Sequence, residues 1–153
     1  MSGLLAGLTA VLALIHDITI MLSVYVIFGI PLNETFIAAL LTILGYSIND
    51  TIVSYDRIRE NSRLSRKDTI DELVNKSINQ SLSRIISTSI TTLISVITVY
   101  IFASISGITS LKEFSFPIVV GVIAGTYSSI FIASPLWAGW KSSQQKKHIS
   151  QKA

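Results

Sequence analysis

The chain has 153 residues, of which 50% are hydrophobic and 14% are charged, with a net charge of +3. A soluble globular domain carries about 25% charged residues. Only two of the 21 Lys, Arg, Asp and Glu residues fall within four long apolar segments, which excludes an ordinary water-soluble enzyme. These segments are residues 4–28, 35–55, 85–105 and 114–138.

Each segment is long enough to cross a membrane, because a hydrocarbon core of about 30 Å requires roughly 20 consecutive apolar residues. We therefore predict an all-α fold, a polytopic membrane helical bundle with four transmembrane helices, whose transmembrane domain covers residues 1–138. A short cytoplasmic amphipathic helix is also expected in the connection 56–84. Thr69 and Glu72 have the spacing of a capping box there, and apolar residues then recur at helical intervals. They are Ile70, Leu73, Val74, Ile78 and Leu82.

The basic residues predict the orientation of the chain. The connection 56–84 holds seven Lys and Arg residues and the tail 139–153 holds four, whereas the two short connections hold only Lys112. Because positive residues stay on the cytoplasmic side, we expect both termini, the connection and the basic tail to be cytoplasmic in a cell inner membrane. Five basic residues of the connection are expected to attract anionic lipid headgroups: Arg57, Arg59, Arg63, Arg66 and Lys67. A solvated positive-inside loop and a specific docking site for a cytosolic partner fit this connection equally well.

Residue types used by many enzymes are missing or scattered. The chain has no Cys, and its two His residues, His16 and His148, are far apart in the sequence. No nucleotide-binding loop, nucleophile triad or metal-ligand cluster is visible, and the placement of the basic residues explains the positive charge without nucleic acid. We expect no catalytic residue, metal, cofactor or nucleic-acid partner.

Asp50 is the strongest candidate for a functional residue. It lies about six residues, or roughly 9 Å of helix, inside the cytoplasmic end of the second span. A charge at membrane depth costs about 2.5–3.5 kcal/mol on insertion scales and marks a functional hypothesis. Arg84, which opens the third span, is the expected counter-charge. Burial favours the protonated form of Asp and a nearby Arg favours the ionised form, so the pair is suited to proton transfer; a purely structural ion pair is the alternative.

Other polar residues are candidates for a supporting path. Asp17 lies in the middle of the first span beside His16, for which packing is the favoured role. Hydroxyl residues recur along the third span at helical spacing, where they either relay protons or bond only to helix backbone and neighbouring helices. The supporting path would comprise Asn49, Thr88, Thr91, Ser95 and Thr98.

Small residues recur every four positions along the fourth span, as Gly121, Gly125, Ser129 and Ala133. Such a ridge lets another helix approach closely. We predict that Gly121, Gly125 and Ser129 serve helix packing rather than chemistry.

Several long motifs occur along the chain. The longest is the sequence Gly-Tyr-Ser-Ile-Asn-Asp-Thr-Ile-Val at residues 45–53, followed by Asp-Arg-Ile-Arg-Glu-Asn at residues 56–61. Further pieces are the His-Asp pair at 16–17, the segments 83–84 and 91–93, and the segment 125–135. In sequence and in order, these motifs strongly resemble those of the SecF family of protein-export membrane proteins.

The resemblance implies a subunit that works with SecD beside a SecYEG channel, within the resistance-nodulation-division superfamily. It implies that proton flow through the membrane part drives later stages of preprotein translocation. Asp50 and Arg84 match the family's intramembrane acid and base, and Asp17 matches the acid of its His-Asp pair. Membrane lipids and, indirectly, the unfolded preprotein are further expected contacts.

The spans present resemble the last four of six in the family. The usual first span, extracytoplasmic domain and second span are not matched, so a fragment, one half of a split gene and a reduced version all fit the sequence. A non-conducting scaffold that holds SecD and channel partners is the alternative function. A stand-alone transporter of a small solute is a weaker one, because four spans offer little cavity and show no internal repeat.

Overall fold

The computed structural model describes residues 3–64 and 69–150, with side chains described up to residue 144. Four helical segments are long and apolar enough to span a membrane: Gly3–Phe28, Glu34–Leu64, Ile70–Ile105 and Thr109–Gln144. Within the described residues there is no strand. The predicted all-α membrane bundle with four spans is therefore confirmed. The elements in chain order are α1 (Gly3–Phe28), α2 (Glu34–Leu64), α3 (Ile70–Ile105), α4 (Thr109–Ser128), the π-helical turn η1 (Ser129–Ala133) and α5 (Ser134–Ser150).

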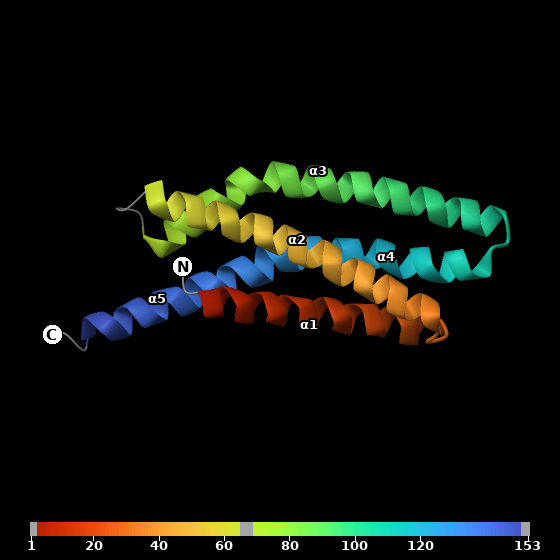
Figure 1. The fold of residues 1–153 in the computed structure, drawn as a ribbon, viewed down its shortest axis with the longest axis horizontal. Helices are drawn as coiled ribbons and strands as arrows, with labels where there is room; N and C mark the ends of the chain where they lie inside the picture. Colours follow the sequence, from red (N-terminus) through yellow and green to blue (C-terminus); the bar gives the residue numbers. More distant parts are fainter. Residues whose placement is uncertain (1–2, 65–68, 151–153) are drawn as a thin grey trace.

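The helices run back and forth along one long axis (Figure 1). The α1–α2 and α3–α4 turns lie at one end of the bundle, whereas the start of α1, the end of α2, the start of α3 and the end of α5 lie at the other. Helix α4 contacts α1, α2 and α3 and continues through η1 into α5, so it forms the centre of the packing. The basic residues of the connection and the tail whose side chains the structure describes lie on the last turns of α2, the first half of α3 and α5: Arg57, Arg59, Arg63, Lys76, Arg84 and Lys141.

The short amphipathic helix expected in the connection is not a separate element of the described structure. The predicted capping box is present at Thr69 and Glu72, but the helix that it starts runs without a break from Ile70 to Ile105. The physical reason is that these 36 residues include no Gly or Pro to end the helix. The amphipathic stretch is the first part of α3, and it continues directly into the membrane span.

Helix α2 also continues beyond its predicted apolar end. It reaches Leu64, and its last turns pack against the first turns of α3. Asn61 Nδ2 donates hydrogen bonds to Ser77 Oγ at 2.9 Å and to Gln80 Oε1 at 2.8 Å. These bonds join the two helices beyond the apolar segments. Two of the basic residues proposed to contact lipid headgroups or a cytosolic partner, Arg66 and Lys67, lie outside the described residues.

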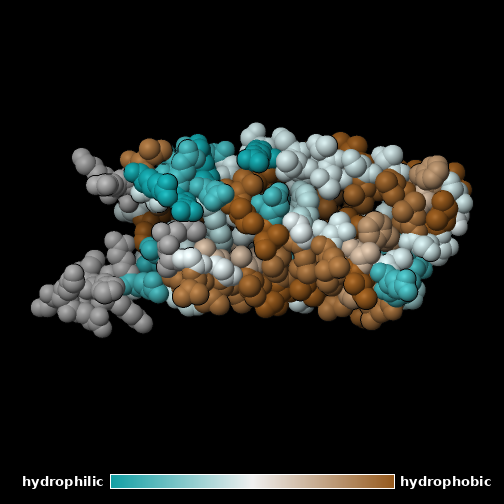
Figure 2. All heavy atoms as spheres, in the orientation of Figure 1, coloured by the Kyte–Doolittle hydropathy of each residue, from teal (hydrophilic) through white to brown (hydrophobic). Residues whose placement is uncertain are grey.

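The surface carries an apolar region suited to lipid. Figure 2 shows hydrophobic residues over α1 and the middle of the molecule, and hydrophilic residues gathered where α2 ends and α3 begins. Large apolar side chains are exposed on α1 and α3, among them Val11, Ile15, Ile90 and Ile94. Because a soluble protein rarely exposes so continuous an apolar surface, this distribution fits a multi-pass membrane protein.

The ridge of small residues on α4 lies against α2. A Cβ atom added to Gly121 would come within 2.5 Å of the Ile43 side chain, and one added to Gly125 would come within 3.1 Å of Ser47 Cβ. Ser129 Oγ donates to the Ser47 carbonyl oxygen at 3.2 Å. The absence of side chains at these two glycines therefore sets the distance between α2 and α4.

We expect Gly121→Val to destabilise the fold by about 1–3 kcal/mol, the usual cost of overpacking a well-packed core. The branched side chain would collide with buried Ile43. Thermal unfolding of the purified protein in detergent measures the loss. Gly45→Ala is the matched control, because a Cβ atom at this helical position meets nothing within 4 Å. Equal stability of the two variants would contradict the close α2–α4 packing.

Candidate functional site

Asp50 lies on the second span with its carboxyl group buried. Its side chain belongs to α2, and the residue is 3% exposed. Oδ2 is buried and has no hydrogen-bond partner among the described residues. Because an unpaired buried charge is costly, the structure favours either a proton on this carboxyl group or a partner from outside the chain.

Arg84 lies on α3 at the edge of a groove between α2 and α3. The groove has a volume of about 480 Å³, and its wall includes Asn49, Arg57 and Ser81. Arg84 is exposed, and no ion pair within 4.0 Å joins its side chain to that of Asp50 in the described structure. The expected ion pair is therefore not formed among the described residues, although Asn49, which precedes Asp50 on α2, lines the same groove as Arg84.

Asp17 is the centre of a buried hydrogen-bond network between α1, α2 and α4. Its exposed fraction is 0%. Ser47 Oγ donates to Asp17 Oδ2 at 2.5 Å and Ser128 Oγ donates to the same oxygen at 2.9 Å. His16 Nδ1 lies 3.1 Å from Asp17 Oδ1. Both carboxylate oxygens therefore have partners, in contrast to Asp50 Oδ2.

The network continues into the π-helical turn. Thr51 Oγ1 and Ser129 Oγ are 3.0 Å apart, and Ser129 also contacts the backbone of Ser47. Asp50 lies between Ser47 and Thr51 on α2, so residues on both sides of it are held against α4 or η1. We infer that this network fixes the rotation of α2 about its axis and hence the direction of the Asp50 side chain.

The hydroxyl residues of the third span lie on an exposed face of α3. Each donates a hydrogen bond to a backbone carbonyl about one turn earlier: Thr88 to Ile85 at 2.9 Å, Thr91 to Ser87 at 2.9 Å, Ser95 to Thr91 at 2.9 Å and Thr98 to Ile94 at 2.7 Å. Asn49 is also exposed. The structure therefore places these residues on the outside of the four-span bundle, where a further subunit or lipid would meet them.

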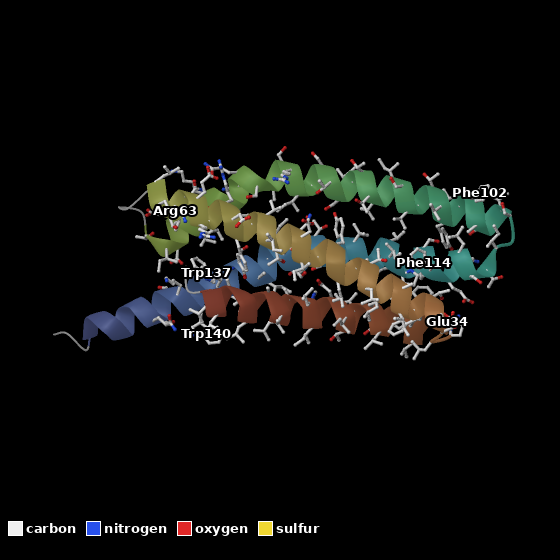
Figure 3. All side chains as sticks on the ribbon, in the orientation of Figure 1. Glu34, Arg63, Phe102, Phe114, Trp137 and Trp140 are labelled. Atoms are coloured by element: carbon white, nitrogen blue, oxygen red, sulfur yellow. The ribbon has the colours of Figure 1, made fainter. Side chains whose placement is uncertain are left out.

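The two ends of the bundle differ in the side chains that they carry. Figure 3 shows Arg63 and Trp137 toward the end that holds the chain termini, and Phe102, Phe114 and Glu34 toward the other. The groove beside Arg84 is also lined by Glu60 and Gln80, so it belongs to the first of these ends. Its wall reaches Asn49, which precedes Asp50 on α2.

The pairing of Asp50 with Arg84 stays a prediction, and the hydroxyl partners of Asp17 were not predicted. Ser47 and Ser128 come from different helices, α2 and α4, so no spacing in the sequence links them. The only available signal was the small-residue ridge, which placed Ser129 on the packing face of the fourth span. That signal identifies the face but not its hydrogen bonds.

Comparison with known proteins agrees with the motifs. Residues 4–143 match the family described as protein export membrane protein SecD/SecF, C-terminal. The chain is 46% identical over 144 residues to the protein translocase subunit SecF of Alicyclobacillus acidocaldarius, covering 92% of this chain and 46% of that protein. It is 48% identical over 140 residues to SecF of Petrotoga mobilis, covering 92% of this chain and 45% of that protein.

Solved structures give the same relationship. A crystal structure of SecDF in a super-membrane-facing form matches with a TM-score of 0.87 and 44% identity, over 96% of this chain and 20% of that one. A second structure, SecDF from Thermus thermophilus, described as a translocon-associated membrane protein, matches with a TM-score of 0.83 and 45% identity, over 90% of this chain and 19% of that one. The chain spans less than half the length of the SecF relatives and about a fifth of SecDF. With four membrane helices, the family motifs and these matches, the chain belongs to the SecD/SecF family of protein export membrane proteins and corresponds to a SecF C-terminal membrane portion.

Proposed function

We propose that the chain is part of a SecF-like subunit that couples proton flow across the cell inner membrane to preprotein translocation. Its partners would be a SecD-like subunit and a SecYEG-type channel. The named relatives are protein translocase subunits SecF and SecDF, which supports a role in protein transport. Both termini and the connection 56–84 would face the cytoplasm, because the connection and the tail 139–153 hold eleven of the twelve Lys and Arg residues of the sequence.

The observation that carries this proposal is the buried, unpartnered carboxylate oxygen of Asp50. A proton on Asp50 removes most of the cost of burial, whereas an ionised Asp50 is stabilised when Arg84 approaches. Protonation would weaken the attraction between the two residues and let α2 and α3 shift. Ionisation would draw them together again.

The groove beside Arg84 supports a route for the proton. It is lined by polar residues of α2 and α3 and lies at the basic end of the bundle. Asn49 would assist there, and the exposed hydroxyl residues would continue the path where α3 meets a partner: Thr88, Thr91, Ser95 and Thr98. Asp17 would support the site through α2, which its hydrogen bonds hold in place.

A second candidate function is that of a non-conducting scaffold. The hydrogen-bond network around Asp17 favours it, since Ser47 and Ser128 bind the same carboxylate from two different helices. In this case Asp50 and Arg84 would only attach helices or subunits to one another. The two functions predict different results when the two charges are exchanged.

The test compares Asp50→Arg with the double variant Asp50→Arg, Arg84→Asp. We expect the double variant to restore recovery of the complex on purification without restoring gradient-dependent export, because Arg at position 50 cannot release a proton. Both are measured on the protein in its membrane complex. Export that returns together with the complex would contradict the proton-coupling role and support the scaffold.

A further inference from the structure

A second cavity lies at the end of the bundle opposite the groove beside Arg84. It has a volume of about 410 Å³ and is formed where the α1–α2 turn meets the start of α4. The two turns at this end contain Gly29 and Gly107, whose φ angles of 61° and 68° favour glycine. The cavity is therefore framed by two tight turns whose backbone conformations are well defined.

Aromatic rings form one wall of this cavity. Phe28 from α1 and Phe116 from α4 meet edge to face with ring centroids 4.9 Å apart, and Tyr100 from α3 lies 5.8 Å from Phe116. Ile30 and Pro31 add further apolar surface. Such a wall suits the glycerol and upper acyl region of a lipid, because Tyr is enriched at the membrane–water interface and the Phe rings offer apolar surface to an acyl chain.

Two opposite charges line the same cavity without neutralising each other. Lys112 is exposed, and neither Lys112 nor Glu113 takes part in an ion pair within 4.0 Å among the described residues. Asn33 Nδ2 donates to Glu113 Oε2 at 3.1 Å, and Tyr25 Oη donates to the Glu113 carbonyl oxygen at 3.4 Å. The carboxylate is thus held in place while its charge stays available to a cationic ligand.

We propose that this cavity is a binding site for a zwitterionic phospholipid. The turns end the apolar helix segments, so the cavity lies at the depth of the headgroups of one leaflet. The lipid phosphate would bind Lys112, its ammonium group would bind Glu113, and its glycerol and acyl region would lie against Phe28 and Phe116. An anionic lipid has no ammonium group, so its phosphate would pair with Lys112 and Glu113 would have no partner. The negative charge of that phosphate would also lie next to Glu113 without being compensated.

Native mass spectrometry of the detergent-purified protein tests the site with defined lipids. We expect dioleoylphosphatidylethanolamine to bind at least about fivefold more tightly than dioleoylphosphatidylglycerol, the effect of roughly one charge-assisted contact. Glu113→Gln should remove this preference, and Lys112→Gln should weaken both lipids. Lys141→Gln is the matched control, since this residue lies on α5 at the other end of the bundle, and it should leave both affinities unchanged.

Three results would overturn the proposal. The first is equal or tighter binding of the anionic lipid by the unmodified protein. The second is binding of soluble glycerophosphoethanolamine as tight as that of the whole lipid, which would indicate a site for a free phosphodiester. The third comes from a photoreactive amino acid at Thr109, which lines the cavity: in cells it should crosslink to lipid, and capture of a translocase protein there would instead identify a protein segment as the occupant. None of these measurements depends on proton coupling.

Discussion

Replacing Asp50 with Asn is expected to abolish export that depends on the proton gradient while leaving membrane insertion and abundance intact. Asn has almost the shape of Asp but cannot take up and release a proton. Since the substitution also removes an ionisable group from a buried, unpartnered position, folding should not suffer. We expect at least about a tenfold loss of export rate, which corresponds to about 1.4 kcal/mol in the barrier. Export of a secretory protein is measured in membrane vesicles with and without a proton gradient.

Two comparison variants make the Asp50 experiment specific. Asp50→Glu keeps an ionisable carboxyl group and should retain part of the gradient-dependent export. Thr42→Ala changes an exposed residue of the same helix, whose hydroxyl donates only to the Ala38 carbonyl at 2.8 Å, and should export like the unmodified protein. Normal gradient-dependent export by Asp50→Asn would show that this carboxyl group does not carry the proton.

Replacing Asp17 with Leu is expected to lower the free energy of unfolding by on the order of 2–3 kcal/mol. The substitution removes the acceptor of two buried hydroxyl groups, Ser47 and Ser128. Ser128 Oγ retains the Gly125 carbonyl at 3.1 Å, whereas Ser47 Oγ is left unsatisfied, and a buried polar group left unsatisfied costs about 1–3 kcal/mol. Asp17→Asn should lose less than half as much, because the amide oxygen still accepts both hydrogen bonds. Thermal unfolding in detergent measures the two losses.

The same two variants separate a structural role of Asp17 from a proton-carrying one. Thr19→Ala is the control on α1, because Thr19 is exposed and its hydroxyl donates to the Ile15 carbonyl at 2.8 Å. If Asp17→Asn is stable but exports as poorly as Asp50→Asn, then Asp17 itself exchanges a proton. If Asp17→Leu is as stable as the Thr19 control, the hydrogen-bond network does not hold the helices together.

The spans were predictable from sequence, but the ends of the helices were not. An apolar segment ends where the hydrocarbon core of the membrane would end, whereas a helix ends at a cap, a glycine or a proline. This is why the second helix extends to Leu64 rather than to residue 55, and why the third begins at Ile70 rather than at residue 85. The capping box at Thr69 marked the true start of α3, but the charged residues that follow it concealed the continuity with the span.

The candidate site was predictable only in part, for a similar reason. A charge within an apolar segment is visible in the sequence, so Asp50 and Asp17 could be identified. The difference in hydrogen bonding between the two carboxyl groups could not be predicted, since it depends on partners from other helices. Asp17 accepts hydrogen bonds from Ser47 and Ser128, while Asp50 Oδ2 has no partner among the described residues. The antiparallel order of the spans accounts for Arg84 and Asp50 lying on neighbouring helices, α3 and α2. The gap between them depends on side-chain placement, which no spacing encodes.

The π-helical turn at Ser129–Ala133 makes this part of the chain tolerant of the loss of one residue. Its hydrogen bonds run from residue i to i+5 instead of i+4, so the turn holds one more residue than an α-helical turn does. Deleting one residue within it would therefore restore α-helical geometry without rotating the helix that follows. Trp137, which is 2% exposed and packs in the same cluster as Tyr55 and Ile58, would still face these residues. In an alignment of relatives, a one-residue gap at this turn would thus leave the same side of α5 facing the bundle.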